Sequence, residues 1–115
     1  MEKKNIVKEK SFDFAVNIVN LYKELIESNE FVMSKQLLKS GTSIGANIRE
    51  AEFAQSKPDF ICKMSISLKE VNETDYWLDL LYKTKFINAV AFERFKVKSA
   101  EILKILITIV KSSKK

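Results

Sequence analysis

The chain has 115 residues, of which 46% are hydrophobic and 30% charged, and its formal net charge is +5. This length and composition are typical of one soluble globular domain, which we expect to span residues 1–115. The chain holds two glycines, one proline, one cysteine and no histidine. So few turn-forming residues argue against a fold of many strands. The missing histidine excludes most zinc sites and any catalytic mechanism with a histidine base.

Two segments with helical spacing of apolar residues fill the first half of the chain. The first expected helix covers about residues 11–28, with Ser11 as its N-cap. The second covers about residues 33–55 and carries Leu37, Ile44 and Ile48 on one stripe. The stretch between them is short, so we expect the two helices to be antiparallel neighbours.

Two further helices are predicted in the second half. The third covers about residues 57–83, after Ser56 as N-cap, with Pro58 in its first turn. The fourth covers about residues 89–111, after Asn88 as a candidate cap. Its segment "ILKILITIV" is apolar on nearly every side, which predicts burial on more than one face or contact with another chain. We therefore predict an all-α fold, an antiparallel up-down-up-down four-helix bundle.

Both glycines of the chain, Gly41 and Gly45, lie four residues apart inside the second expected helix, in "SGTSIGANIREA". A glycine inside a helix costs about 1 kcal/mol relative to alanine. Residues four apart share one helix face, so we interpret the pair as a site of close helix packing. The alternative is a smooth surface that contacts another subunit or a partner.

Polar residues also share faces on the two central helices. Ser43, Asn47 and Glu50 lie on one face of the second helix, and Glu70 and Glu73 lie on one face of the third. We interpret these five as a structural polar network or an interface, in which Asn47 donates a hydrogen bond to a carboxylate and fixes the register of the helices.

A carboxylate metal site is the alternative for Glu50, Glu70, Glu73 and Asp75. Such sites in helical bundles draw on Glu-x-x-His pairs, and this chain has no histidine. We therefore expect no metal and no cofactor. Cys62 lies beside an apolar stripe, so we expect a buried or half-buried thiol.

Positive charge is concentrated at the C-terminal end. Residues 83–115 hold nine lysines and arginines against two acids, while residues 1–82 hold eleven against thirteen. A basic surface of this kind is suited to phosphate groups, and its preponderance of lysine over arginine favours recognition of shape and charge over base reading. The candidate nucleic-acid-binding residues are Lys83, Lys85, Arg94, Lys96, Lys98 and Lys104.

The two central segments, "QLLKSGTSIGANIREA" and "DFICKMSISLKEVNETDYWLDLL", also carry a resemblance. They resemble the four-helix-bundle family of proteins encoded within intervening sequences of bacterial 23S ribosomal RNA genes, which is similar to the accessory protein of diversity-generating retroelements. The resemblance implies a homo-oligomeric ring of five subunits, no enzymatic activity and a role in binding nucleic acid. The matching positions are Gln36, Ser43, Ile44, Asn47, Ile48, Glu50, Phe60, Leu68, Glu70, Glu73, Trp77 and Leu78.

Two hypotheses for the function follow. The first is a non-enzymatic homo-oligomer, a pentamer, that binds structured nucleic acid, RNA in preference to DNA, through its lysine-rich surface. The second is a scaffold or accessory subunit for another protein, for example a reverse transcriptase, without direct nucleic-acid binding. The N-terminal "MEKKNIVKEK" lacks the apolar core of a signal peptide, and no run of about 18 apolar residues occurs, so we expect a cytoplasmic protein without a membrane partner.

Overall fold

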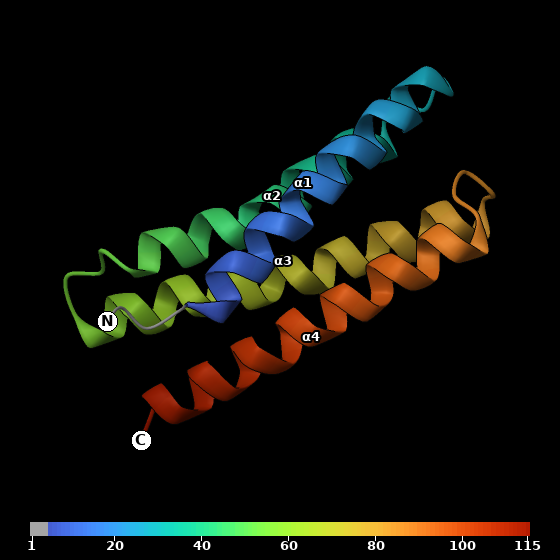
Figure 1. The fold of residues 1–115 in the computed structure, drawn as a ribbon. Helices are drawn as coiled ribbons and strands as arrows, with labels where there is room; N and C mark the ends of the chain where they lie inside the picture. The colour runs from blue at the N-terminus through green and yellow to red at the C-terminus, as the bar shows by residue number, and fades with distance from the viewer. Residues whose placement is uncertain (1–4) are drawn as a thin grey trace.

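The structure, a computed structural model that describes residues 5–115, consists of four helices (Figure 1). They are α1 (Ile6–Glu27), α2 (Met33–Ala51), α3 (Lys57–Lys83) and α4 (Ala89–Ser113). Each helix packs against the next along the chain, and α1 and α4 close the bundle through the smallest contact. The antiparallel up-down-up-down four-helix bundle is confirmed. The first four residues of the predicted domain lie outside the described residues.

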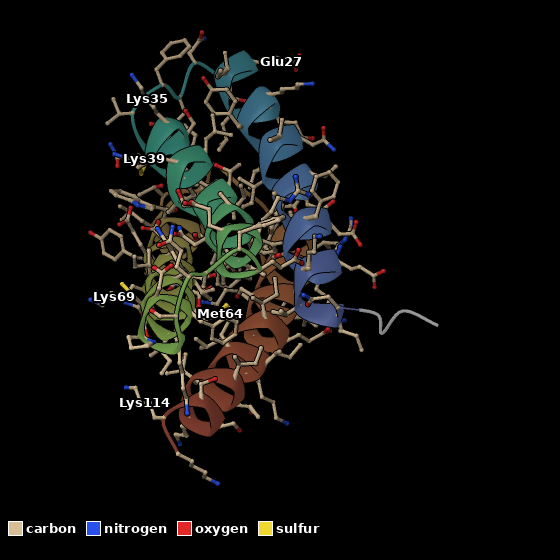
Figure 2. All side chains as sticks on the ribbon, turned by 90° about the vertical axis from the view of Figure 1, so that its left-hand side faces the viewer. Glu27, Lys35, Lys39, Met64, Lys69 and Lys114 are labelled. Atoms are coloured by element: carbon tan, nitrogen blue, oxygen red, sulfur yellow. The ribbon has the colours of Figure 1, made fainter. Side chains whose placement is uncertain are left out.

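One apolar core runs between the four helices. The stripe predicted for α2, which includes Leu37, Ile44 and Ile48, is buried. Figure 2 shows Met64 of α3 inside the bundle, whereas Lys39 and Lys69 point outward. The apolar segment of α4 is mostly absorbed by this core. Its Ile102, Leu106 and Val110 are buried, its Leu103, Ile105 and Ile109 are partly buried, and Ile107 is exposed.

The helix α1 begins five residues earlier than expected. Asn5 is its N-cap and accepts a hydrogen bond from the backbone N–H of Lys8 at 3.1 Å. The prediction that Ser11 caps α1 is therefore wrong. Ser11 lies buried inside the helix, and its hydroxyl donates to the backbone carbonyl of Lys8. A serine can satisfy its hydroxyl in this way within a helix, so its presence does not mark a helix start.

The start of α2 depends on Glu30, a buried residue that the sequence reasoning did not single out. Its carboxylate accepts backbone hydrogen bonds from Val32, Met33 and Ser34, the last at 2.6 Å. Burial raises the pKa of Glu30, but these donors outweigh it and hold the pKa below its ordinary value of 4.5. The carboxylate therefore satisfies the free N–H groups of the first helical turn.

The helix α2 ends at Ala51, four residues before the predicted end. Beyond it, the N–H groups of Glu52, Phe53 and Ala54 each bond to the carbonyl three residues earlier. This pattern is the tighter turn that commonly finishes an α-helix. The side chain of Glu52 reaches α1, where it forms an ion pair with Lys8 at 3.0 Å.

The caps predicted for the last two helices are confirmed. Ser56 accepts from the N–H of Asp59 at the start of α3, and Asn88 accepts from the N–H of Ala91 at the start of α4. The helix α3 has its predicted bounds, and α4 runs two residues past its predicted end. No described helix is both long enough and apolar enough to cross a membrane.

The two glycines of α2 face α1. A Cβ atom built on Gly41 would come within 2.8 Å of both Cγ atoms of Ile18, closer than real Cβ contacts allow. A Cβ atom on Gly45 would meet the hydroxyl of Ser11 at 3.3 Å. The missing side chains therefore let α1 approach α2 closely within the same chain.

Hydroxyl groups cross the opposite side of α2 to α3. Ser67 donates to the backbone carbonyl of Ile44 at 2.8 Å, and Thr74 donates to the hydroxyl of Ser40 at 3.0 Å. Both bonds are buried, where a slip of one helix along the other would leave polar groups without partners. These contacts therefore fix the register of α2 and α3.

We expect Glu30→Ala to lower the free energy of unfolding by about 2 kcal/mol, because three backbone N–H groups lose a charged acceptor. The pKa of Glu30 is lower in the folded state, so its contribution is full above pH 4.5 and is lost as the pH falls through the folded pKa. Urea unfolding at pH 7 and below pH 4 measures both effects. The matched control is Glu27→Ala, an exposed acid at the end of α1 (Figure 2), and an equal loss in both variants would contradict the capping role.

Gly41→Ala and Gly45→Ala gain the same helix propensity, about 1 kcal/mol each. At Gly41 the gain is offset by overpacking against Ile18, which costs roughly 1 to 3 kcal/mol. We therefore expect Gly41→Ala to be less stable than Gly45→Ala in thermal and urea unfolding. The reverse order would mean that α1 moves away from α2 at little cost.

Candidate nucleic-acid interface

Lys83 and Lys85 lie at the turn between α3 and α4, where they border an open hollow with Phe86 and Asn88. The turn closes with hydrogen bonds from the N–H of Lys85 to the carbonyl of Tyr82 and from the N–H of Phe86 to that of Leu81. This arrangement places Lys85 at φ 70°, a conformation usually taken by glycine. The backbone thus holds an exposed lysine where a glycine would be easier to accommodate.

Arg94 and Lys98 lie one turn apart on the side of α4 that faces α1. Both are exposed, and neither forms an ion pair with residues 5–115. Lys104 is also exposed, but each residue turns a helix by about 100°, so it projects roughly 120° away from Lys98 around α4. The predicted cations therefore form a pair at the turn, a pair on α4 and an isolated lysine.

Lys96 faces α3 instead and is held by acids. Its ammonium group lies 3.1 Å from Asp79 and 3.5 Å from Asp75, and it also lies over the ring of Phe92. Ser99 adds a hydrogen bond to Asp75 at 2.7 Å. The structure therefore does not bring Lys96 together with Arg94 and Lys98, and its contacts join α3 to α4. A nucleic-acid role for Lys96 stays a prediction.

A groove of about 280 Å³ separates α1 from α4 beside Arg94 and Lys98. Leu21 and the half-buried Phe95 supply apolar surface in this groove, and the Phe95 ring meets the buried Phe14 edge-on. The remaining lining residues are Asn17, Asn20 and Glu24 of α1 and Ala91 of α4. The sequence reasoning missed these α1 residues. The only available signal was two asparagines inside a helix, where asparagine is a poor helix former.

The five polar residues of the central helices form no shared network. Ser43 and Asn47 each donate to a backbone carbonyl four residues earlier in α2, at 2.7 and 2.8 Å. Glu50 pairs with Lys63 at 3.5 Å. The expectation that Asn47 donates to a carboxylate is wrong, because its amide is used within its own helix. The interface alternative for these residues stays a prediction.

Glu70 and Glu73 lie together on α3. Burial raises the pKa of Glu70, and the neighbouring charge of Glu73 raises it further against a smaller opposing effect of Lys39. Glu73 accepts a hydrogen bond from the indole of Trp77 at 3.2 Å, and Trp77 packs partly buried against the core. Within residues 5–115, no three His, Cys, Asp or Glu side chains gather as metal ligands would.

Two further expectations on α3 are wrong. Cys62 is exposed, because it lies one position off the buried stripe and faces away from the core. Tyr82, which was expected on the apolar stripe, is 39% exposed. It stacks on Phe92 of α4 with ring centroids 4.2 Å apart, so its packing closes the end of the bundle.

A second groove, of about 430 Å³, lies between α1 and α2 over Gly45 and Ala46. The exposed rings of Phe12 and Phe53 line it, and Arg49 lies over the Phe12 ring at 5.9 Å. Gly45 therefore serves close packing on one side and leaves a smooth, apolar surface beside it.

We expect Lys96→Glu to lower the free energy of unfolding by about 1 kcal/mol, because it places a third acid beside Asp75 and Asp79. Lys98→Glu, two residues away, is expected to change stability by less than half of that. Urea unfolding of both variants at low and high salt measures the difference, which added salt should reduce. Equal stability of the two variants would contradict a structural role for Lys96.

Comparison with known proteins identifies relatives of the chain. A family model described as "23S rRNA-intervening sequence protein" matches residues 3–108. A crystal structure of a protein with unknown function, from the S23 ribosomal protein family of Bacteroides thetaiotaomicron, is 62% identical with a TM-score of 0.90. The match covers 91% of this chain and 98% of that one. No curated protein matches the chain. This four-helix bundle therefore belongs to the family of 23S rRNA-intervening sequence proteins.

Proposed function

We propose that the protein is a non-enzymatic, cytoplasmic homo-oligomer that binds structured RNA through α4 and the α3–α4 turn. One observation carries this proposal: five of the six candidate cations are exposed and form no ion pair with residues 5–115, whereas Lys96 does. Unpaired cations on one helix and its adjoining turn suit the phosphate backbone, which supplies the missing counter-charge. The five are Lys83, Lys85, Arg94, Lys98 and Lys104.

The character of these cations favours recognition of charge and shape. Four of the five are lysines, which bind phosphate as point charges, and only Arg94 has the planar group suited to paired contacts with bases. Their separation along α4 and the turn suits a phosphate backbone that passes over several points. We therefore propose binding to folded RNA without a fixed sequence.

Apolar side chains on the outer surface support self-association. Val90, Val97 and Ile107 of α4 are 69%, 56% and 37% exposed. Val90 and Val97 are seven residues apart, which places them on one stripe of the helix. Assembly through such surfaces would repeat the cations of α4 around a ring. We propose five subunits, as the family resemblance implies.

The second candidate function is a scaffold for another protein. The groove between α1 and α2 favours it, because Phe12 and Phe53, 55% and 80% exposed, border apolar surface over Gly45. Exposed aromatic side chains beside such a groove are typical of protein contact sites. Binding there would tolerate salt, in contrast to the attraction of phosphate by the cations.

We expect Arg94→Glu combined with Lys98→Glu to weaken RNA binding roughly tenfold or more and to reduce the slope of log affinity against log salt by about two. Lys85→Gly removes one cation at a position that glycine accepts easily, so a smaller loss of affinity should come without loss of stability. Fluorescence anisotropy with a folded RNA, from low to physiological salt, measures both. Light scattering fixes the number of subunits in each sample.

The control is Lys35→Glu combined with Lys69→Glu, which makes the same change in net charge at exposed lysines of α2 and α3 (Figure 2). We expect this control to lose little affinity. An assembled oligomer that binds no RNA at low salt would overturn the proposal and direct attention to the scaffold function. Equal losses in both double variants would mean that net charge, and not the surface of α4, governs binding.

A further inference from the structure

We propose that the groove between α1 and α4 binds one unpaired ribonucleotide of the RNA. This inference rests on the proposed RNA binding and adds to it a defined contact site. The groove has a volume of about 280 Å³, near the lower end of the range for small-molecule sites, which is roughly 300 to 1,000 Å³. A space of this size accepts a single nucleotide unit and excludes a duplex.

The two walls of the groove differ in charge. The α4 wall presents Arg94 and Lys98, whose positive charges have no ion-pair partner among residues 5–115. The α1 wall presents two amides and one carboxylate, those of Asn17, Asn20 and Glu24. A phosphate is attracted to the first wall and repelled by Glu24. A bound nucleotide is therefore oriented with its phosphate toward α4 and its sugar and base toward α1.

The surface between the walls is suited to a base. Leu21 and Phe95 contribute apolar atoms, and Phe95 is held in place by its edge-on contact with Phe14, with ring centroids 6.0 Å apart. Ala91 contributes only a methyl group, so the space between the diverging helices stays open. Unpaired bases commonly bind aromatic and apolar side chains in this way, whereas bases inside a duplex are stacked and inaccessible.

The α1 wall has free hydrogen-bonding capacity. The side-chain amides of Asn17 and Asn20 make no hydrogen bond to the described residues, and each offers two donors and one acceptor carbonyl. Both can therefore bond to the edge of a base. The ionised carboxylate of Glu24 only accepts hydrogen bonds, and the ribose 2′-hydroxyl is a donor that it can use. This contact favours RNA over DNA.

Two probes test the site: an RNA hairpin with an unpaired loop, and a blunt RNA duplex with the same number of phosphates. We expect the wild-type protein to bind the hairpin about tenfold more tightly than the duplex. Asn17→Ala combined with Asn20→Ala should remove roughly that tenfold preference, because the base loses its hydrogen-bond partners. The variant should bind the duplex as the wild type does, with the same salt dependence, because no charge has changed.

The matched control is Asn72→Ala, which removes an exposed asparagine of α3, far from the groove in the chain. Each of these substitutions places a better helix former in a helix, so the variants should remain folded, which circular dichroism checks. Equal binding of hairpin and duplex, or an unchanged preference in the Asn17/Asn20 variant, would overturn the groove as the site. If salt-dependent binding through Arg94 and Lys98 persists in that case, the proposed function stands without the groove.

A DNA hairpin of the same sequence tests the sugar contact. It should bind several-fold more weakly than the RNA hairpin, and Glu24→Gln should narrow the difference, since an amide accepts the 2′-hydroxyl less strongly than a carboxylate does. Equal binding of the RNA and DNA hairpins would overturn the role of Glu24. Failure of every RNA and DNA probe to bind at low salt would overturn both the groove site and the proposed function.

Discussion

The close approach of α1 and α2 is the constraint on which the bundle depends. Gly41 and Gly45 remove the two side chains that would hold α1 away, so Ile18 and Ser11 lie directly against the backbone of α2. Ile18 is fully buried as a result. The packing returned by this approach offsets the poor helix propensity of glycine. It also sets the angle at which α1 passes over the rest of the molecule, and hence its distance from α4.

Polar contacts on either side of α3 then fix the remaining helices. Buried hydroxyl groups join α3 to α2 through Ser67 and Thr74, and Ser99 with Lys96 joins α4 to the acids of α3. Apolar contacts alone would allow such helices to slide along each other. Directional bonds on both sides of α3 make it the reference element of the fold. The seam between α1 and α4 is joined chiefly by apolar packing and by the exposed ion pair of Lys10 with Glu101.

The sequence predicted the fold class and the later helices well, because the signals there are local. Ser56 and Asn88 cap the residues that directly follow them, so their pattern alone locates the starts of α3 and α4. The start of α1 and the capping of α2 by Glu30 were missed. The hydroxyl of Ser11 is satisfied by its own helix, and a glutamate three or four residues ahead of a helix is not a usual cap.

The candidate site was predicted only in part, since membership of a surface depends on helix rotation and on the neighbouring helix. Spacing placed Arg94 and Lys98 together and Lys96 elsewhere, but it gave no sign that Asp75 and Asp79 hold Lys96. Asn17 and Asn20 gain their interest from α4, which lies more than seventy residues away in the chain. A single sequence carries no signal for that juxtaposition.

The small contact between α1 and α4 has a consequence for the order of folding. Contacts between successive helices join residues that are near in sequence, whereas the α1–α4 seam joins the two ends of the chain and closes the longest loop. The central α2–α3 hairpin, with its buried hydroxyl bonds, therefore forms early, and the terminal helices dock on it afterwards. Amide hydrogens along the α1–α4 seam should accordingly exchange faster than those of the hairpin, since the last contact to close is the first to open.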